Sequence, residues 1–187
     1  MTWLESIAFV LGIANVTLVV RRSLWNYPVA LVMVSLYGVL FWQERLYSDA
    51  ALQLFFFVIN LYGWLVWRRS VARAGEVMVE TLSPSARASW LGGIALASLL
   101  WGGGMVYATD AAMPFWDAAN AVASVAAQIL LARRRLENWL LWIAVDLSSI
   151  ALYAVKGLML TAILYVIFLG LSVWGYREWR RLAWGRA

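Results

Sequence analysis

The sequence predicts an all-α integral membrane protein with seven transmembrane helices, arranged as a parallel repeat of three, one and three helices. Composition is the first reason: of 187 residues, 64% are hydrophobic and only 13% are charged, whereas soluble domains are about half apolar and about a quarter charged. The second is a series of seven apolar stretches of membrane-spanning length. The third is an internal similarity between the first three stretches and the last three.

The apolar stretches fall at about 3–20, 24–43, 50–67, 89–109, 114–132, 138–155 and 158–176. Trp and Tyr residues stand close to their ends, which is typical of side chains at the lipid headgroups. This aromatic belt is predicted to comprise Trp25, Tyr27, Trp42, Tyr47, Trp67, Trp139 and Trp179.

The basic residues predict how the helices are oriented. One side of the predicted topology holds Arg21, Arg22, Arg68, Arg69, Arg73, Arg87, Arg133, Arg134, Arg135, Arg177, Arg180, Arg181 and Arg186, and the other holds Arg45 and Lys156. Because cytoplasmic loops are enriched in Lys and Arg, we expect the C-terminus in the cytoplasm and the N-terminus outside. The basic net charge of +5 then reflects topology, and no nucleic-acid partner is expected.

The internal repeat appears at an offset of 112 residues without gaps. It pairs Arg21 with Arg133, Asn26 with Asn138, Gly63 with Gly175 and Trp67 with Trp179. We therefore divide the chain into a first three-helix bundle (1–69), a cytoplasmic loop with a linker helix (70–110), and a second three-helix bundle with a cytoplasmic tail (111–187). Parallel repeats of this kind are known among transporters, which hold substrate near the midplane between the halves.

Several function classes are excluded by residues that the chain lacks. It contains no Cys and no His, which removes thiol nucleophiles, Ser-His-Asp triads, haem ligation and most zinc sites. The polar segment 68–88 is too short for a nucleotide-binding domain, and no Walker sequence is present. We expect neither an enzyme nor a cofactor or metal site.

Polar residues inside the predicted spans follow single helix faces, which cannot face lipid without cost. They predict a substrate site near the midplane, although amides of this kind also hold helices together. The candidate substrate-binding residues are Gln53, Asn60, Trp64, Asn120, Gln128, Trp142, Asp146 and Tyr153.

Asp146 is the most informative of these candidates. A carboxylate at mid-helix costs about 2.5–3.5 kcal/mol on insertion scales, and no Lys or Arg lies at a predicted helix centre to pair with it. It is therefore protonated, hydrogen-bonded by neighbours, or paired with a cationic ligand. Trp142 and Trp64 favour the last interpretation, because aromatic faces attract organic cations.

Several segments of the chain carry a resemblance to a known family: Asn138 through Asp146, Leu152 through Leu158, Gln128 through Arg134, and Asn60 through Trp67. They resemble the PnuC family of bacterial nicotinamide riboside transporters, and the resemblance covers nearly the whole chain. It implies a location in the bacterial inner membrane. The resemblance implies a fold akin to SWEET sugar transporters, a homotrimer, and substrate contacts at Trp142, Asp146, Asn60 and Trp64. Some family members carry Asn at the position of Asp146, and related members move thiamine or riboflavin, so the vitamin stays open.

The sequence thus predicts import of nicotinamide riboside by facilitated diffusion, with alternating access between two three-helix bundles. One alternative is a thiamine or other vitamin transporter of the same family. The other is a structural membrane subunit without substrate, in which the polar faces only join helices.

Overall fold

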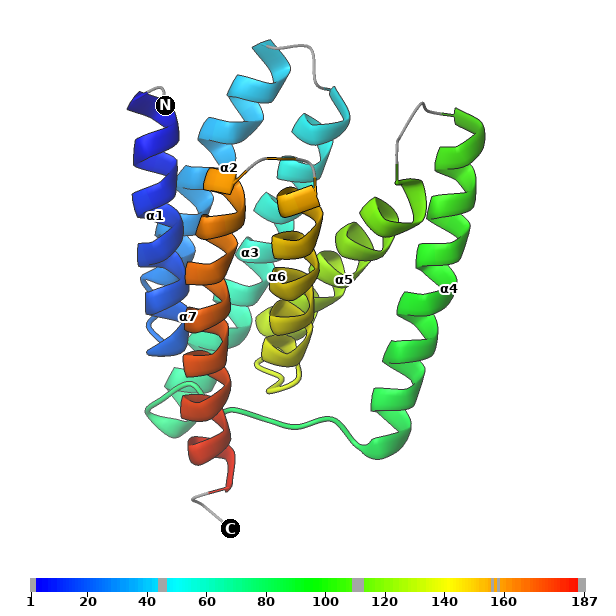
Figure 1. Ribbon diagram of the computed structural model, residues 1–187. Coiled ribbons are helices and arrows are strands. Elements are labelled where there is room, and N and C mark those ends of the chain that lie inside the picture. Colours follow the sequence, from blue (N-terminus) through cyan, green and yellow to red (C-terminus); the bar gives the residue numbers. More distant parts are fainter. Residues whose placement is uncertain (1–2, 44–46, 109–112, 156, 158, 185–187) are drawn as a thin grey trace.

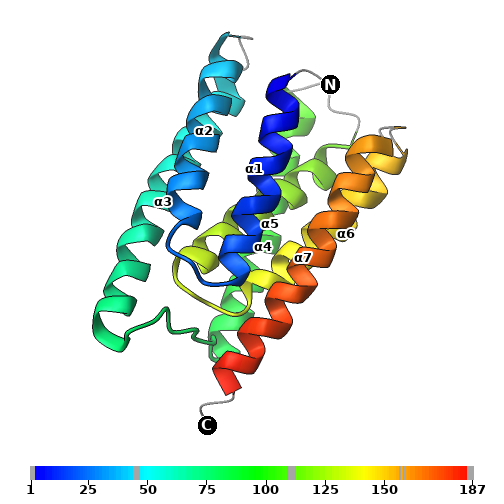
Figure 2. The same ribbon diagram turned by 90° about the vertical axis from the view of Figure 1, so that its left-hand side faces the viewer.

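The computed structural model describes residues 3–43, 47–108, 113–155, 157 and 159–184. In these ranges the chain forms helices that run up and down in alternation (Figures 1 and 2). They are α1 (Trp3–Val20), α2 (Asn26–Gln43), α3 (Tyr47–Ala74), α4 (Pro84–Ala108), α5 (Pro114–Ala132), α6 (Asn138–Val155) and α7 (Met159–Trp184). Each of the apolar stretches predicted from the sequence coincides with one of these helices.

Two helices continue well beyond the apolar stretches that predicted them. Helix α3 extends past Trp67 to Ala74, and α7 extends to Trp184. The hydropathy signal stops at the first arginines, but helical hydrogen bonding does not need apolar side chains outside the bilayer. Helix α3 ends where Gly75 adopts a positive φ of 74° and its N–H donates to the Val71 carbonyl at 2.8 Å, a left-handed cap that glycine adopts without strain.

The helices are those of a membrane protein. Within the described residues α4, α5 and α6 are both long and apolar enough to cross a bilayer, and Val10–Val20 and Asn26–Val39 are shorter apolar segments. Large apolar side chains lie exposed along several helices, as at Leu54, Leu100 and Leu147. Such exposure is unfavourable in water and natural in lipid.

The helices form two groups joined through α4. In the first group α2 packs against α1 and α3, and in the second α6 packs against α5 and α7. The groups meet where α1 packs on α7 and α3 packs on α5. Helix α4 contacts α5 alone among the described helices, and in Figure 1 it stands at the edge of the molecule. Close approach there depends on Gly102, because an added Cβ would lie 2.5 Å from the Phe115 ring.

The turns that follow α1 and α5 have the same local structure. Arg22 and Arg134 have positive φ values of 56° and 61°, which are uncommon for residues other than glycine. The N–H of Arg22 donates to the Val19 carbonyl at 2.9 Å, and that of Arg134 donates to the Leu131 carbonyl at 2.8 Å. The next helices, α2 and α6, begin at Asn26 and Asn138. These equivalent positions are 112 residues apart, as in the sequence repeat.

Four of the aromatic residues predicted for the headgroup belt are buried instead. Tyr27, Trp67, Trp139 and Trp179 are at most 2% exposed and form an aromatic cluster, with ring centroids 5.2–5.8 Å apart along the chain of contacts. The belt prediction is wrong for these four, because their helices turn them toward the opposite group rather than toward lipid. Trp25, at 71% exposure, fits the belt, whereas the side chains of Trp42 and Tyr47 lie outside the described part.

Indole hydrogen bonds from this aromatic cluster join the two groups of helices. The Trp67 N–H of α3 donates to the Leu131 carbonyl of α5 at 3.3 Å, and the Trp179 N–H of α7 donates to the Val20 carbonyl of α1 at 3.2 Å. Each tryptophan thus caps a carbonyl at the end of a helix in the other group, where helix carbonyls lack partners within their own helix.

The loop between α3 and α4 crosses the same end of the molecule. Arg22 pairs with Glu76 at 3.0 Å and donates to the Val77 carbonyl at 2.7 Å. On the other group, Arg134 pairs with Glu80 at 2.6 Å. The loop is therefore held by equivalent arginines from both groups, and it covers the arginine-rich end.

Candidate substrate-binding site

A cavity of about 400 Å³ lies between the two groups of helices. Helices α1, α2 and α3 contribute one wall, and α5, α6 and α7 contribute the other. It is lined by Asn15, Val16, Val19, Asn26, Ala30, Met33, Val34, Tyr37, Gln53, Phe56, Asn60, Gln128, Leu131, Trp139, Trp142, Asp146, Tyr165, Phe168 and Ser172. The lining is mainly apolar and aromatic with a few polar groups, which is the usual make-up of a small-molecule site.

Asp146 supplies a carboxyl group to this cavity. Its side chain projects from α6 and is 3% exposed. The Ser172 hydroxyl of α7 donates to Asp146 Oδ2 at 2.8 Å, which fixes the rotamer of the carboxyl group. No Lys or Arg is among the described lining residues. A bound cation is therefore the natural partner for this group when it is ionised.

Three amide side chains also line the cavity, and a hydrogen bond between two of them joins the two groups of helices. Gln128 Nε2 of α5 donates to Asn60 Oδ1 of α3 at 3.2 Å. Asn60 Nδ2 in turn donates to the Phe56 carbonyl at 2.8 Å. Gln53 lies two helical turns before Asn60 on the same face of α3. These groups offer both donors and acceptors to a polar ligand.

Aromatic rings make up much of the α6 and α7 wall. Trp142 lies one helical turn before Asp146 on the same face of α6. Tyr165 and Phe168 of α7 are in edge-to-face contact, with centroids 6.0 Å apart at 84°. A cation that reaches Asp146 therefore meets aromatic faces beside the carboxylate, an arrangement that favours organic cations.

Buried polar atoms at the cavity wall lack protein partners. Asn15 Oδ1 and Trp139 Nε1 have no hydrogen-bond partner among the described residues. A buried polar group without a partner costs about 1–3 kcal/mol.

The cavity brings together five of the eight candidates from the sequence: Gln53, Asn60, Gln128, Trp142 and Asp146. The other three have different surroundings. Trp64, one helical turn after Asn60 on α3, packs against the hydrophobic core beside the aromatic cluster and is not among the described lining residues. Asn120 Nδ2 donates to Ser149 Oγ at 3.3 Å.

Tyr153 lies behind the cavity wall. Its ring stacks on Tyr165 with centroids 5.4 Å apart at 24°, and Tyr165 lines the cavity. The Tyr165 hydroxyl also interacts with Ser149, the partner of Asn120. Asn120 and Tyr153 therefore support a lining residue and do not themselves line the cavity.

Sequence reasoning missed several lining residues, chiefly Asn15, Tyr37, Tyr165, Phe168 and Ser172. A usable signal was present in the repeat. Gln53 and Asn60 were candidates, and the residues 112 positions later are Tyr165 and Ser172. The residues 112 positions after Tyr37 and Asn15 are Ser149 and Ala127, which were not candidates. The repeat therefore gave no signal for Tyr37 and Asn15.

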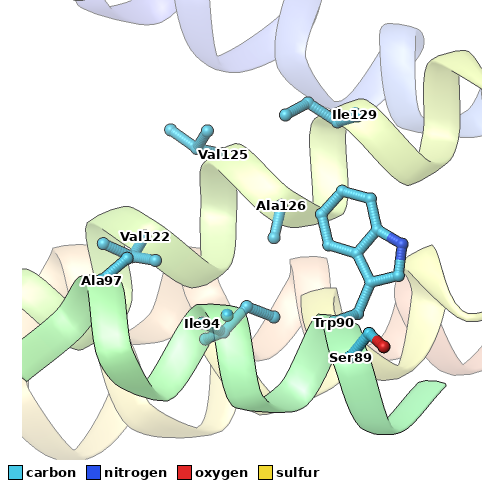
Figure 3. A pocket seen from close by; sticks show the side chains of 9 residues that line it. Ser89, Trp90, Ile94, Ala97, Val122, Val125, Ala126 and Ile129 are labelled. Atoms are coloured by element: carbon cyan, nitrogen blue, oxygen red, sulfur yellow. The ribbon is translucent and has the colours of Figure 1, made fainter. Parts of the chain in front are cut away.

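A second cavity of about 310 Å³ lies in the groove between α4 and α5. Figure 3 shows its wall, with Trp90, Ile94 and Ala97 on α4 and Val122, Val125, Ala126 and Ile129 on α5. Ser89 is the only lining side chain with a hydroxyl, and none of the described lining residues is charged. A polar or cationic ligand fits the first cavity better.

Known proteins similar to this chain are membrane transporters. Nicotinamide riboside transporter PnuC of Escherichia coli K12 is 28% identical, over 96% of this chain and 85% of that protein. PnuC of Neisseria mucosa is 32% identical, over 97% of this chain and 73% of that protein. The riboflavin/roseoflavin transporter RibM of Streptomyces davaonensis is 30% identical, over 95% of this chain and 84% of that protein.

A solved structure has the same fold. The crystal structure of the vitamin B3 transporter PnuC matches with a TM-score of 0.79 and 28% identity, covering all of this chain and 84% of that one. The family profile described as "Nicotinamide mononucleotide transporter" matches residues 2–181. The family expected from the sequence is confirmed: the chain belongs to this family of membrane transporters.

Proposed function

We propose that this protein imports nicotinamide riboside across the bacterial inner membrane. One observation carries the proposal: Asp146 and Trp142 lie side by side on α6 in a cavity whose described lining has no basic residue. Nicotinamide riboside has a pyridinium ring with a fixed positive charge, and this ring can stack on an aromatic face beside a carboxylate. Similarity to transporters of this compound supports the same substrate.

The remaining lining residues suit the uncharged parts of the molecule. Its ribose hydroxyls and its carboxamide both donate and accept hydrogen bonds. Gln53, Asn60, Gln128 and Asn15 can pair with them, while Ser172 holds the Asp146 carboxyl group in place. A pocket that combines an aromatic face with a few oriented polar groups gives both affinity and a defined pose.

Another vitamin is the second candidate, because a similar protein is a riboflavin/roseoflavin transporter. Thiamine also carries a fixed positive ring, and Asp146 would favour it for the same reason. Riboflavin is uncharged, so it would gain little from the carboxylate. An ionised Asp146 would therefore favour a cationic vitamin.

The decisive experiment measures binding of nicotinamide riboside, thiamine and riboflavin to the purified protein and to Asp146→Asn. This variant keeps the shape of the side chain and removes its charge. We expect binding of the cationic ligands to weaken about tenfold or more, a loss of at least roughly 1.4 kcal/mol. Unchanged affinity in a folded Asp146→Asn protein would rule out the ion-pair role.

Transport is proposed to follow alternating access between two structurally repeated halves, α1–α3 and α5–α7. The matching Arg22 and Arg134 turns support the repeat, and the cavity lies between the halves, where a rocking motion would expose it to each side in turn. The aromatic cluster and the loop held by Arg22 and Arg134 lie at the arginine-rich end.

Movement is proposed to be facilitated diffusion. The described lining offers one carboxyl group and no recognisable sodium site or proton relay. Vesicles should therefore show saturable counterflow of labelled nicotinamide riboside that ionophores do not abolish. Accumulation driven by a sodium or proton gradient would contradict this, and absence of any saturable flux would favour the structural-subunit alternative.

The proposed topology has seven spans, with the N-terminus outside and the C-terminus in the cytoplasm. The arginine-rich end of the molecule, near the end of α7, would then face the cytoplasm. Because the chain has no Cys, single cysteines at Thr2 and Ala187 can be labelled with an impermeant reagent. We expect labelling from opposite sides, whereas labelling from one side would require an even number of spans.

The proposed assembly is a homotrimer, as the family resemblance implies. The exposed apolar surface of α4 is available for contact between copies or with lipid. Light scattering of the purified protein in detergent should give the mass of three chains. A monomeric mass with full binding activity would count against the trimer.

A further inference from the structure

Helices α2 and α6 face each other across the substrate cavity. Each contacts its neighbours within its own group, and the groups meet through α1 with α7 and α3 with α5. No contact joins α2 to α6 in the described part of the chain. Both helices nevertheless line the cavity, so the cavity itself separates them.

Residues 112 positions apart occur together in the lining. Seven such pairs have both members at the cavity: Val16 and Gln128, Val19 and Leu131, Ala30 and Trp142, Val34 and Asp146, Gln53 and Tyr165, Phe56 and Phe168, and Asn60 and Ser172. The cavity therefore lies where equivalent faces of the two halves meet.

The α2 and α6 walls differ sharply in chemistry at equivalent positions. Where α6 presents Trp142 and Asp146, α2 presents Ala30 and Val34, which are 3% and 6% exposed. A bulky side chain on α2 at either position would project toward α6 and take up cavity volume. At these two positions α6 supplies an aromatic ring and a carboxyl group, and α2 leaves space for a ligand.

We propose that Ala30 and Val34 are specificity-determining residues that set the size of the ring system admitted between α2 and Trp142. This inference rests on the proposed function, because it assumes that the cavity binds a vitamin with an aromatic ring. A ring stacked on Trp142 has its other face toward α2. The small side chains there leave room for one ring, and their size limits how much larger the ring system can be.

The experiment compares variants that enlarge or reduce the α2 wall. The purified full-length protein carries Val34→Phe, Ala30→Leu or Val34→Ala, and binding of nicotinamide riboside and riboflavin is measured by titration calorimetry and by quenching of riboflavin fluorescence. Val32 provides matched controls, Val32→Phe and Val32→Ala, because it lies on the same helix and is 55% exposed. Thermal unfolding in detergent checks that each variant is folded.

Enlargement should weaken binding of nicotinamide riboside about tenfold or more, because overpacking of a filled site is costly. Val34→Ala should raise the ratio of riboflavin affinity to nicotinamide riboside affinity by about threefold or more, by analogy with the removal of methyl groups from a pocket. Both Val32 controls should match the unmodified protein.

Two results separate this inference from the proposed function. If the unmodified protein binds nicotinamide riboside but the affinity ratio is unchanged in Val34→Ala and in Ala30→Leu, the size-selecting role is overturned and the proposed function stands. If the protein binds riboflavin alone, the proposed substrate is wrong. The inference is still supported in that case when Val34→Phe and Ala30→Leu abolish riboflavin binding, and overturned when they do not. Binding of neither ligand overturns both.

Discussion

The two halves of the molecule agree at their turns and differ at the cavity. Arg22 and Arg134 share the same positive φ and equivalent backbone hydrogen bonds, whereas Val34 and Asp146 at equivalent positions share no chemistry. The turns and helix crossings need particular residues to form at all. The cavity wall needs only compatible volume, so equivalent positions there can carry different side chains.

The largest effect is expected at two glycines that occupy equivalent positions in the two halves. An added Cβ at Gly175 would lie 2.5 Å from the Trp139 ring, and at Gly63 it would lie 2.7 Å from the Tyr27 hydroxyl. Gly63→Ala and Gly175→Ala should each lower the free energy of unfolding by about 1–3 kcal/mol, because neither buried ring can move away freely.

Thermal unfolding in detergent measures this effect in both variants. Gly170→Ala is the matched control, since nothing lies within 4 Å of its added Cβ. If only one of the two buried glycines proves sensitive, the halves are less alike than their backbone turns indicate.

The next effect concerns only the α6 side of the cavity. Trp142→Ala should weaken binding of nicotinamide riboside by about 0.5–2 kcal/mol, the range for stacking of a cation on an aromatic ring. Trp174→Ala removes an indole that is 40% exposed on α7 and should leave affinity unchanged. Equal losses in both variants would show that the effect is on folding and not on ligand contact.

A smaller effect should distinguish the two arginine turns. Arg134 contacts the Ser70 hydroxyl, the Met78 carbonyl and Glu80, whereas Arg22 contacts Glu76 and the Val77 carbonyl. Arg134→Gly should therefore be less stable than Arg22→Gly by about 1 kcal/mol or less, since the glutamates are partly exposed and screened. Glycine accepts the positive φ at both positions, so the comparison isolates the side-chain contacts. Chemical denaturation measures the free energy of unfolding of both variants. A lower value for Arg22→Gly than for Arg134→Gly would contradict this prediction.

The smallest effect should come from the hydrogen bond that joins the halves inside the cavity. Gln128→Leu removes the donor to Asn60 Oδ1 and should destabilise the protein by about 0.6 kcal/mol, an average value for such bonds in membranes. Val16→Leu, at the equivalent position in the first half, changes an apolar side chain for another and serves as control. A loss several times larger than that of the control would mark this bond as a principal tie between the halves.

Much of the fold could be predicted from local properties of the chain. Apolar length located each of the described helices, and the offset of 112 residues pairs Arg22 with Arg134 in the two equivalent turns. Asp146 stood out because a carboxyl group within an apolar stretch needs a partner wherever it lies. These features are properties of single segments, so the sequence is sufficient to find them.

Only the tertiary structure decided which face of each helix meets the cavity. Trp64 shares a helix with Asn60 yet packs into the core, while Ser172 and Tyr165 join the cavity without any prior sign except their repeat partners. Tyr27, Trp67, Trp139 and Trp179 look like headgroup aromatics and are buried. The rotation of a helix about its axis depends on its packing against helices distant in sequence, and in a helix apolar nearly all round no local pattern distinguishes the face toward lipid from the face toward protein.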